Sequence, residues 1–63
     1  MLYVKAVKRR SAAARAGWKK GDRIRSVGGA PAVDELDLLF YEGEEVEVCV
    51  EGKGSCRIRP EEI

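Results

Sequence analysis

The side chains of this sequence that could take part in chemistry begin with two cysteines. Cys49 and Cys56 could form a disulfide, supply half of a metal site or remain as two free thiols. The chain has no histidine, and two cysteines cannot complete a four-ligand zinc site within one chain. We therefore expect no bound metal.

Candidate catalytic groups are equally few. The carboxylates of Asp34, Asp37 and Glu42 could be imagined as an acid and base pair, but their positions are better explained as helix caps and solvated helix positions. Ser11 is better explained as a helix cap than as a nucleophile. The sequence holds neither a Gly-x-Ser-x-Gly elbow nor a glycine-rich phosphate loop. We expect no catalytic residue, no cofactor and no enzymatic activity in these residues alone.

The cysteines belong to a predicted β-hairpin. Val46, Val48 and Val50 alternate with other residues, which indicates a half-buried strand with the valines inward. A glycine turn over residues 52–54 leads to a second strand over residues 55–59. We predict a register in which the apolar side chains of both strands lie on the core face. The predicted pairs are Val48 with Ile58, Val50 with Cys56, Glu47 with Arg59 and Cys49 with Arg57. The cysteines then face opposite sides of the sheet, so we predict free thiols.

The segment from Ser11 to Ile24 has the most specific local pattern. Ser11 can cap a short Ala-rich helix over residues 12–16, and Gly17 stands where a left-handed C-terminal cap is needed. Trp18 is the apolar residue that folds back over such a cap. Gly21 and Asp22 then turn the chain, and the Asp22 side chain can bond nearby backbone amides as the next strand begins.

The other elements are weaker. Residues 2–7 and 23–27 are predicted strands, and residues 28–31 a turn that includes Gly29. Asp34 could cap a second helix over residues 33–41. The helical spacing of its apolar residues predicts that Leu36, Leu39 and Phe40 face the core. Leu38 and Tyr41 are expected to lie at the side of the helix.

These motifs resemble the signature of bacterial PDZ domains: Ser-Ala-Ala-x-x-Ala-Gly, then Gly-Asp-x-Ile, then Ser26-Val27-Gly28-Gly29. Gly28 stands where the family has Asn, and glycine still permits the turn. The resemblance implies a small α+β fold, a PDZ-like partial β-barrel of about four strands with two short helices. It covers residues 1–60 as one domain, and residues 61–63 read as a tail or the start of a linker.

The helix over residues 33–41 resembles one subgroup more closely, the PDZ-like segment that opens radical-SAM-type iron–sulfur proteins of unknown function. That resemblance implies that the chain could be a docking or regulatory domain of a larger polypeptide. PDZ domains hold the terminal carboxylate of a peptide in a loop just before the binding strand. No such residues precede the first strand here, so carboxylate capture is left open.

Charge is unevenly distributed along the chain. Residues 1–25 hold nine Lys and Arg against Asp22 alone, whereas residues 26–63 hold three against ten Asp and Glu. A basic patch on Lys8-Arg9-Arg10 and Lys19-Lys20 would suit nucleic acid, but we favour two halves that interleave in one fold and neutralise each other. No membrane-spanning or signal segment is evident, so a cytoplasmic protein is expected.

Binding remains as the predicted function. In a PDZ-like fold an extended peptide adds as a strand between the first strand and the second helix. The predicted groove residues are Leu2, Tyr3, Val4, Lys5, Ala6, Leu36 and Phe40. The partner would be a peptide or protein segment, which could belong to the same polypeptide and be anchored by Trp18, Tyr3 or Tyr41. The exposed first strand could instead pair with a second copy of the chain.

Overall fold

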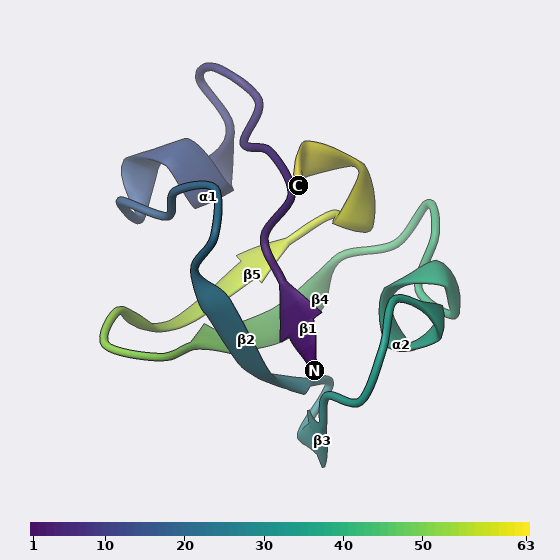
Figure 1. The fold of residues 1–63 in the computed structure, drawn as a ribbon. Coiled ribbons are helices and arrows are strands. Elements are labelled where there is room, and N and C mark those ends of the chain that lie inside the picture. The colour runs from purple at the N-terminus through teal and green to yellow at the C-terminus, as the bar shows by residue number, and fades with distance from the viewer.

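The computed structural model describes residues 1–63 as an open antiparallel sheet with two short helices on its surface (Figure 1). The strands are β1 (Leu2–Tyr3), β2 (Arg23–Val27), β3 (Ala30–Pro31), β4 (Val46–Val50) and β5 (Gly54–Ile58). The helices are α1 (Ala12–Arg15), α2 (Leu36–Leu39) and a 3-10 helix, η1 (Pro60–Glu62). The strand order is β1-β2-β4-β5, with β3 paired to the end of β2. The predicted small α+β fold is confirmed at this level. No helix has the length and apolar character needed to cross a bilayer.

One hydrophobic core lies between the sheet and α1. It has ten buried hydrophobic residues, which come from β1 and the residue after it, from α1 and the loop that follows, and from the three long strands: Leu2, Val4, Ala13, Trp18, Ile24, Val27, Val46, Val48, Val50 and Ile58. The inward-facing valines of β4 were predicted correctly. No charged side chain is buried with them, and the one buried side-chain N or O atom without a hydrogen-bond partner is Nε1 of Trp18.

Helix α1 has the predicted caps. The Ser11 hydroxyl accepts a hydrogen bond from the Ala14 amide, which satisfies one of the unpaired N–H groups of the first turn. At the other end, Gly17 has a φ of 83° and Trp18 donates its amide to the Ala13 carbonyl. With the bond from the Gly17 amide to the Ala14 carbonyl, this is a Schellman motif. The Trp18 side chain folds into the core and is only 3% exposed.

The loop from α1 to β2 is also as predicted at Gly21 and Asp22. Gly21 has a φ of 93°, and the Asp22 carboxylate accepts the Lys19 amide at 2.7 Å. Lys53 from the tip of the β4–β5 hairpin donates to the same carboxylate at 2.8 Å and to the Gly17 carbonyl at 2.6 Å. One lysine thus fastens the hairpin tip to the cap of α1.

The β4–β5 hairpin has the predicted faces but not the predicted register. Val46 pairs with Ile58 and Val48 with Cys56, so the expected pairing of Val48 with Ile58 is wrong by two residues. Because side chains alternate with a period of two, this shift leaves every side chain on its predicted face. The other observed pairs are Glu47 with Arg57, Cys49 with Ser55 and Val50 with Gly54. Both cysteines are free thiols on opposite faces.

The turn between β4 and β5 explains the shifted register. The Lys53 amide donates to the Val50 carbonyl at 3.0 Å, which closes a four-residue turn. Gly52, its third residue, has a φ of 78°, the value that a type II turn requires at that position. This turn is tight enough for β5 to begin at Gly54, one residue earlier than the predicted strand.

The predicted turn over residues 28–31 is in part a strand. Gly28 and Gly29 both have positive φ, 61° and 85°, so they form the two-residue turn of a type I′ hairpin. The following residues, Ala30 and Pro31, pair with Val27 and Ser26 as β3. Pro31 can pair there because β3 lies at the edge of the sheet.

Helix α2 is shorter than the predicted span and is rotated about its axis. Leu36, Leu39 and Phe40, expected to face the core, are 65%, 55% and 80% exposed. Leu38 and Tyr41, expected at the side, are instead packed against the core. The predicted orientation was therefore wrong.

The β2–β3 turn accounts for this orientation. A Cβ atom placed on Gly28 would lie 2.8 Å from Cζ of Tyr41, so the tyrosine ring packs directly against the bare backbone of that glycine. Such a contact lies outside α2, and the helical periodicity of residues 33–41 carries no sign of it. Tyr41 therefore fixes which face of α2 is turned toward the sheet.

The C-terminal 3-10 helix is tied to the segment between β1 and α1. β1 is only two residues long, although Val4 continues its pairing with the loop before β2. The Lys8 amide donates to the Glu62 carbonyl, and the Glu62 carboxylate accepts the Ala12 and Arg59 amides, both at 2.9 Å. The closing residues, which read as a tail from sequence, are ordered on the domain as η1.

Candidate functional site

The outer edge of β1 presents unpaired backbone. The Val4 amide donates to the Asp22 carbonyl, and the Val4 carbonyl accepts the Gly21 amide, both at 2.8 Å. Because successive residues of an extended strand point their polar groups to opposite sides, the N–H and C=O groups of Tyr3 and Lys5 lie on the outer edge. The backbone groups of Lys5 make no hydrogen bond within the chain. This edge can accept another strand.

A groove of about 210 Å³ borders that edge. Its lining residues come from the segment of β1, from the segment of α2 and from the C-terminal residues of η1 and Ile63. Figure 1 shows where these three segments lie. Leucine, proline and isoleucine side chains supply its apolar surface, and charged side chains stand among them. The lining residues are Leu2, Tyr3, Lys5, Glu35, Leu38, Leu39, Glu42, Pro60, Glu61 and Ile63. The volume exceeds the ~150 Å³ of an engineered apolar cavity that admits benzene.

An ion pair joins the two walls of the groove. Lys5 Nζ lies 2.6 Å from Glu35 Oε2, so the segment just after β1 is linked across the groove to the N-cap residue of α2. The hydrogen bond from Lys5 lowers the pKa of the Glu35 carboxyl. Both side chains are more than half exposed, and such pairs contribute little to stability because water screens them. The link can therefore open at small cost.

Asp34 and Asp37 bond backbone amides at the start of α2, although the N-cap residue itself, Glu35, makes no side-chain cap bond. The Asp37 carboxylate accepts the Val33 and Asp34 amides at 2.7 and 3.1 Å, and these bonds lower the pKa of Asp37. Asp34 in turn accepts the Leu36 amide at 2.9 Å. With their oxygens committed to backbone, Asp34 and Asp37 position the helix that forms the second wall of the groove.

Only some of the predicted groove residues line the groove in the structure. Tyr3 and Lys5 line the groove, and Leu2 reaches it from the core. Val4 is buried in the core and Ala6 is exposed outside the groove. Leu36 and Phe40 lie on the opposite side of α2, because the helix is rotated from its predicted orientation. The missed residues are Glu35, Leu38, Leu39, Glu42, Pro60, Glu61 and Ile63.

A shallower hollow of about 240 Å³ lies on that other side of α2. It is lined by Val27, Ala30, Leu36, Asp37, Phe40 and Tyr41. The Phe40 ring stands edge-on to the Tyr41 ring with centroids 5.2 Å apart, while most of its surface faces solvent. Phe40 and Leu36 thus form an exposed apolar face beside the groove. Trp18, one of the predicted docking anchors, is buried in the core and unavailable to a partner.

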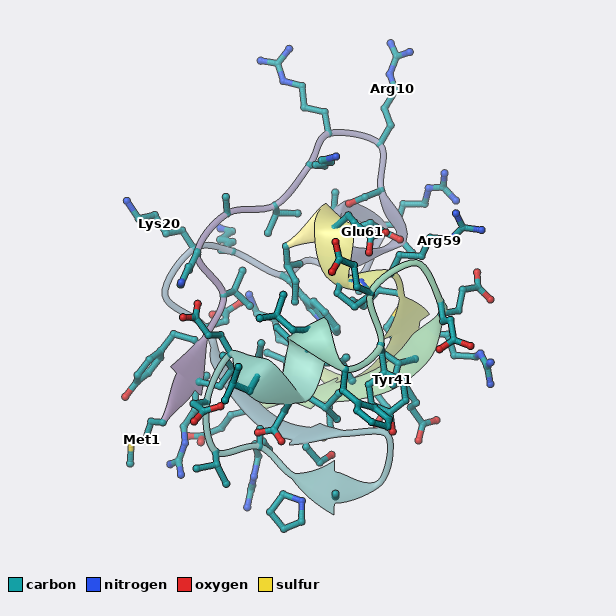
Figure 2. All side chains as sticks on the ribbon, turned by 90° about the vertical axis from the view of Figure 1, so that its right-hand side faces the viewer. Met1, Arg10, Lys20, Tyr41, Arg59 and Glu61 are labelled. Atoms are coloured by element: carbon teal, nitrogen blue, oxygen red, sulfur yellow. The ribbon has the colours of Figure 1, made fainter.

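Ion pairs connect the basic and acidic halves of the chain, but they do not neutralise every basic side chain. Each of the three ion pairs links one half to the other: Lys5 with Glu35, Arg23 with Glu51, and Lys53 with Asp22. The Lys8–Arg10 loop has no carboxylate partner. Figure 2 shows Arg10 projecting from the tip of this loop, and Lys20 pointing out from a different side of the molecule. The two basic runs therefore do not meet in one patch.

No cluster of three or more His, Cys, Asp or Glu side chains is arranged to hold a metal ion. Neither a protein-family model nor a curated protein matches the chain. The groove, the free strand edge beside it and the exposed face of α2 are the surface features that could bind a partner.

Proposed function

We propose that this chain is a non-catalytic, PDZ-like interaction module that binds an extended peptide by strand addition at β1. The observation that carries the proposal is the free backbone edge at Tyr3 and Lys5, which borders an apolar groove. Such an edge supplies backbone hydrogen bonds, and the groove supplies a site for a side chain, which together make up this mode of recognition.

Two local features support the PDZ-like part of the proposal. A Ser-capped helix with a Gly17 C-cap leads through Gly21 and Asp22 into β2, and a second short helix flanks the first strand. A free strand edge is otherwise a liability for aggregation. The Lys5–Glu35 pair spans the groove and must open for a ligand to enter, which costs little because both side chains are exposed.

Amide chemical shifts during titration with a mixed library of short peptides test this function. We expect saturable shifts at Tyr3, Lys5, Leu38 and Leu39. The variant Leu39→Ser removes a groove side chain and should weaken binding. Phe40→Ser, a matched loss on the other side of α2, should leave peptide binding unchanged. If these amides do not move at millimolar peptide, strand addition is refuted.

A second candidate function is favoured by the exposed face of α2. Val33, Leu36 and Phe40 are each more than 60% exposed, an unusual density of apolar surface for so short a segment. This face would suit docking against a larger protein, such as the catalytic part of a radical-SAM-type iron–sulfur protein. The same two variants separate the functions, because docking should fail in Phe40→Ser and persist in Leu39→Ser.

A further inference from the structure

We propose that the groove between β1 and α2 selects extended segments in which a large apolar residue is accompanied by lysine or arginine. This inference rests on the proposed peptide-binding function and adds the chemistry of the ligand. It follows from the charges of the groove, from which of those charges already have partners, and from the spacing of side chains on an added strand.

The rim of the groove is acidic. Three carboxylates, Glu35, Glu42 and Glu61, line it with a single cation, Lys5, so its formal charge is −2. The potential of such a site attracts positive ligands and disfavours negative ones, including nucleic acid. Strand addition through the backbone alone would not distinguish peptides by charge, so the rim is where selectivity arises.

Two of the three carboxylates retain capacity for a ligand. The Glu35 carboxylate already forms an ion pair with Lys5. One oxygen of Glu61, Oε1, accepts the Gly43 amide at 2.9 Å, which leaves its other oxygen without a partner in the chain. The Glu42 side chain makes no hydrogen bond or ion pair, although its backbone is fixed by a bond to Leu39. An incoming ammonium or guanidinium group would therefore meet Glu42 and Glu61 first.

The geometry of a strand fixes where the ligand's cations must stand. Residues two apart on a strand point to the same face and are separated by ~7 Å. When an apolar side chain enters the groove beside Leu38 and Leu39, the residues two positions away face the rim. Lysine or arginine at those positions can extend their flexible stems to the carboxylates. Basic residues at the adjacent positions would point away from the rim.

The test compares three peptides of equal length with a central leucine and lysine, glutamine or glutamate two residues to either side. Binding is followed by amide shifts in the 63-residue chain at low salt and at 0.5 M NaCl. We expect the lysine peptide to bind about fivefold or more tightly than the glutamine peptide. We expect salt to reduce this ratio, because screening acts on exposed charges.

Charge-removing variants locate the effect. Glu42→Gln and Glu61→Gln should each lower the affinity of the lysine peptide about 2–5-fold and leave that of the glutamine peptide unchanged. Glu61→Gln keeps an oxygen for the Gly43 amide, so the fold is not disturbed. The matched control is Glu47→Gln on β4, an exposed carboxylate outside the groove, which should change neither affinity.

The possible results separate this inference from the proposed function. Saturable binding of all three peptides with equal affinity would overturn the charge selectivity and leave strand addition standing. Absence of binding by every peptide would overturn both. Shifts at Tyr3 and Lys5 that depend on protein concentration without peptide would identify a second copy as the occupant and would also overturn the proposal.

Discussion

Replacing Gly28 with asparagine is the most direct test of how α2 is positioned. Asn-Gly is the preferred sequence for the type I′ turn that Gly28 and Gly29 form, so local turn chemistry predicts that Gly28→Asn is harmless or mildly stabilising. The packing of Tyr41 predicts the opposite. A Cβ at this position would lie 2.8 Å from Cζ of the Tyr41 ring and still closer to its hydroxyl, so the ring must move.

The expected loss of stability can be estimated from the buried area that the Tyr41 ring loses. The ring is the end of a flexible side chain, so it can swing away without distorting the backbone, and the cost is its lost packing. A tyrosine buries ~150–250 Å² when fully enclosed, and Tyr41 is partly buried, so about 100 Å² is at stake. At ~25 cal/mol per Å² the upper limit is ~2.5 kcal/mol. With partial repacking, we expect a loss of about 1–2 kcal/mol.

Thermal unfolding measures this loss, and the buried Trp18 is the only tryptophan and hence a single fluorescent reporter of the core. In a domain of this size, 1 kcal/mol corresponds to a Tm shift of ~4–8 °C. The matched control is Gly29→Asn, in the same turn with positive φ but with no atom within 4 Å of the added Cβ. Its loss of stability comes from the strain of a positive φ alone, so we expect it to be the same with and without the Tyr41 ring.

A double-mutant cycle with Tyr41→Ala isolates the contact. If the ring is the obstacle, Gly28→Asn should cost much less in the Tyr41→Ala background than in the native chain. Strict additivity in the cycle would refute the packing of Tyr41 on Gly28. The orientation of α2 would then have to depend on contacts other than that of Tyr41 with Gly28.

Three further predictions concern the rest of the fold. Arg10 is the only residue other than glycine with a positive φ, 60°, so Arg10→Gly should relieve strain and stabilise the chain by about 0.5–1 kcal/mol in thermal unfolding, whereas Arg9→Gly should not. The hydrogen bond from Lys53, followed by that from the Lys19 amide, lowers the pKa of Asp22 below its ordinary value of 3.8. Its contribution to stability is therefore present above pH ~4 and lost as the pH falls through the lower folded pKa, so unfolding of Asp22→Asn measured from pH 7 to pH 2 should lose part of the acid dependence. An acid dependence identical to that of the native chain would contradict this role. Glu62→Ala should cost about 1 kcal/mol in urea unfolding, as the loss of a helix cap does, and Glu61→Ala should cost less.

The sequence specified the elements that depend on local chemistry. The Ser11 cap, the Gly17 stop and the Gly21-Asp22 turn were all predictable, because each involves hydrogen bonds or φ values within a few residues. The inward valines of β4 were likewise visible in a simple alternation. The location of a groove between the first strand and the second helix followed from the family resemblance rather than from these patterns.

Features set by contacts between distant residues could not be read from the sequence. The orientation of α2 depends on Tyr41 meeting Gly28, and the four-residue helix is too short for its own periodicity to decide which face is buried. The hairpin register depends on a turn that starts one residue earlier than expected. The acidic rim depends on Glu61, whose segment read as a tail because its tie to the Gly43 amide spans 18 residues.

The place of η1 has a consequence for any chain attached to this domain. Pro60 and Ile63 line the groove, so residues that follow Ile63 would start beside the site itself. A segment tethered there by a short flexible linker would experience an effective concentration in the millimolar range, and even a weak ligand sequence could occupy the groove without any external partner. A basic tag at that end would compete with peptides in a titration, whereas a longer linker would dilute it and restore access.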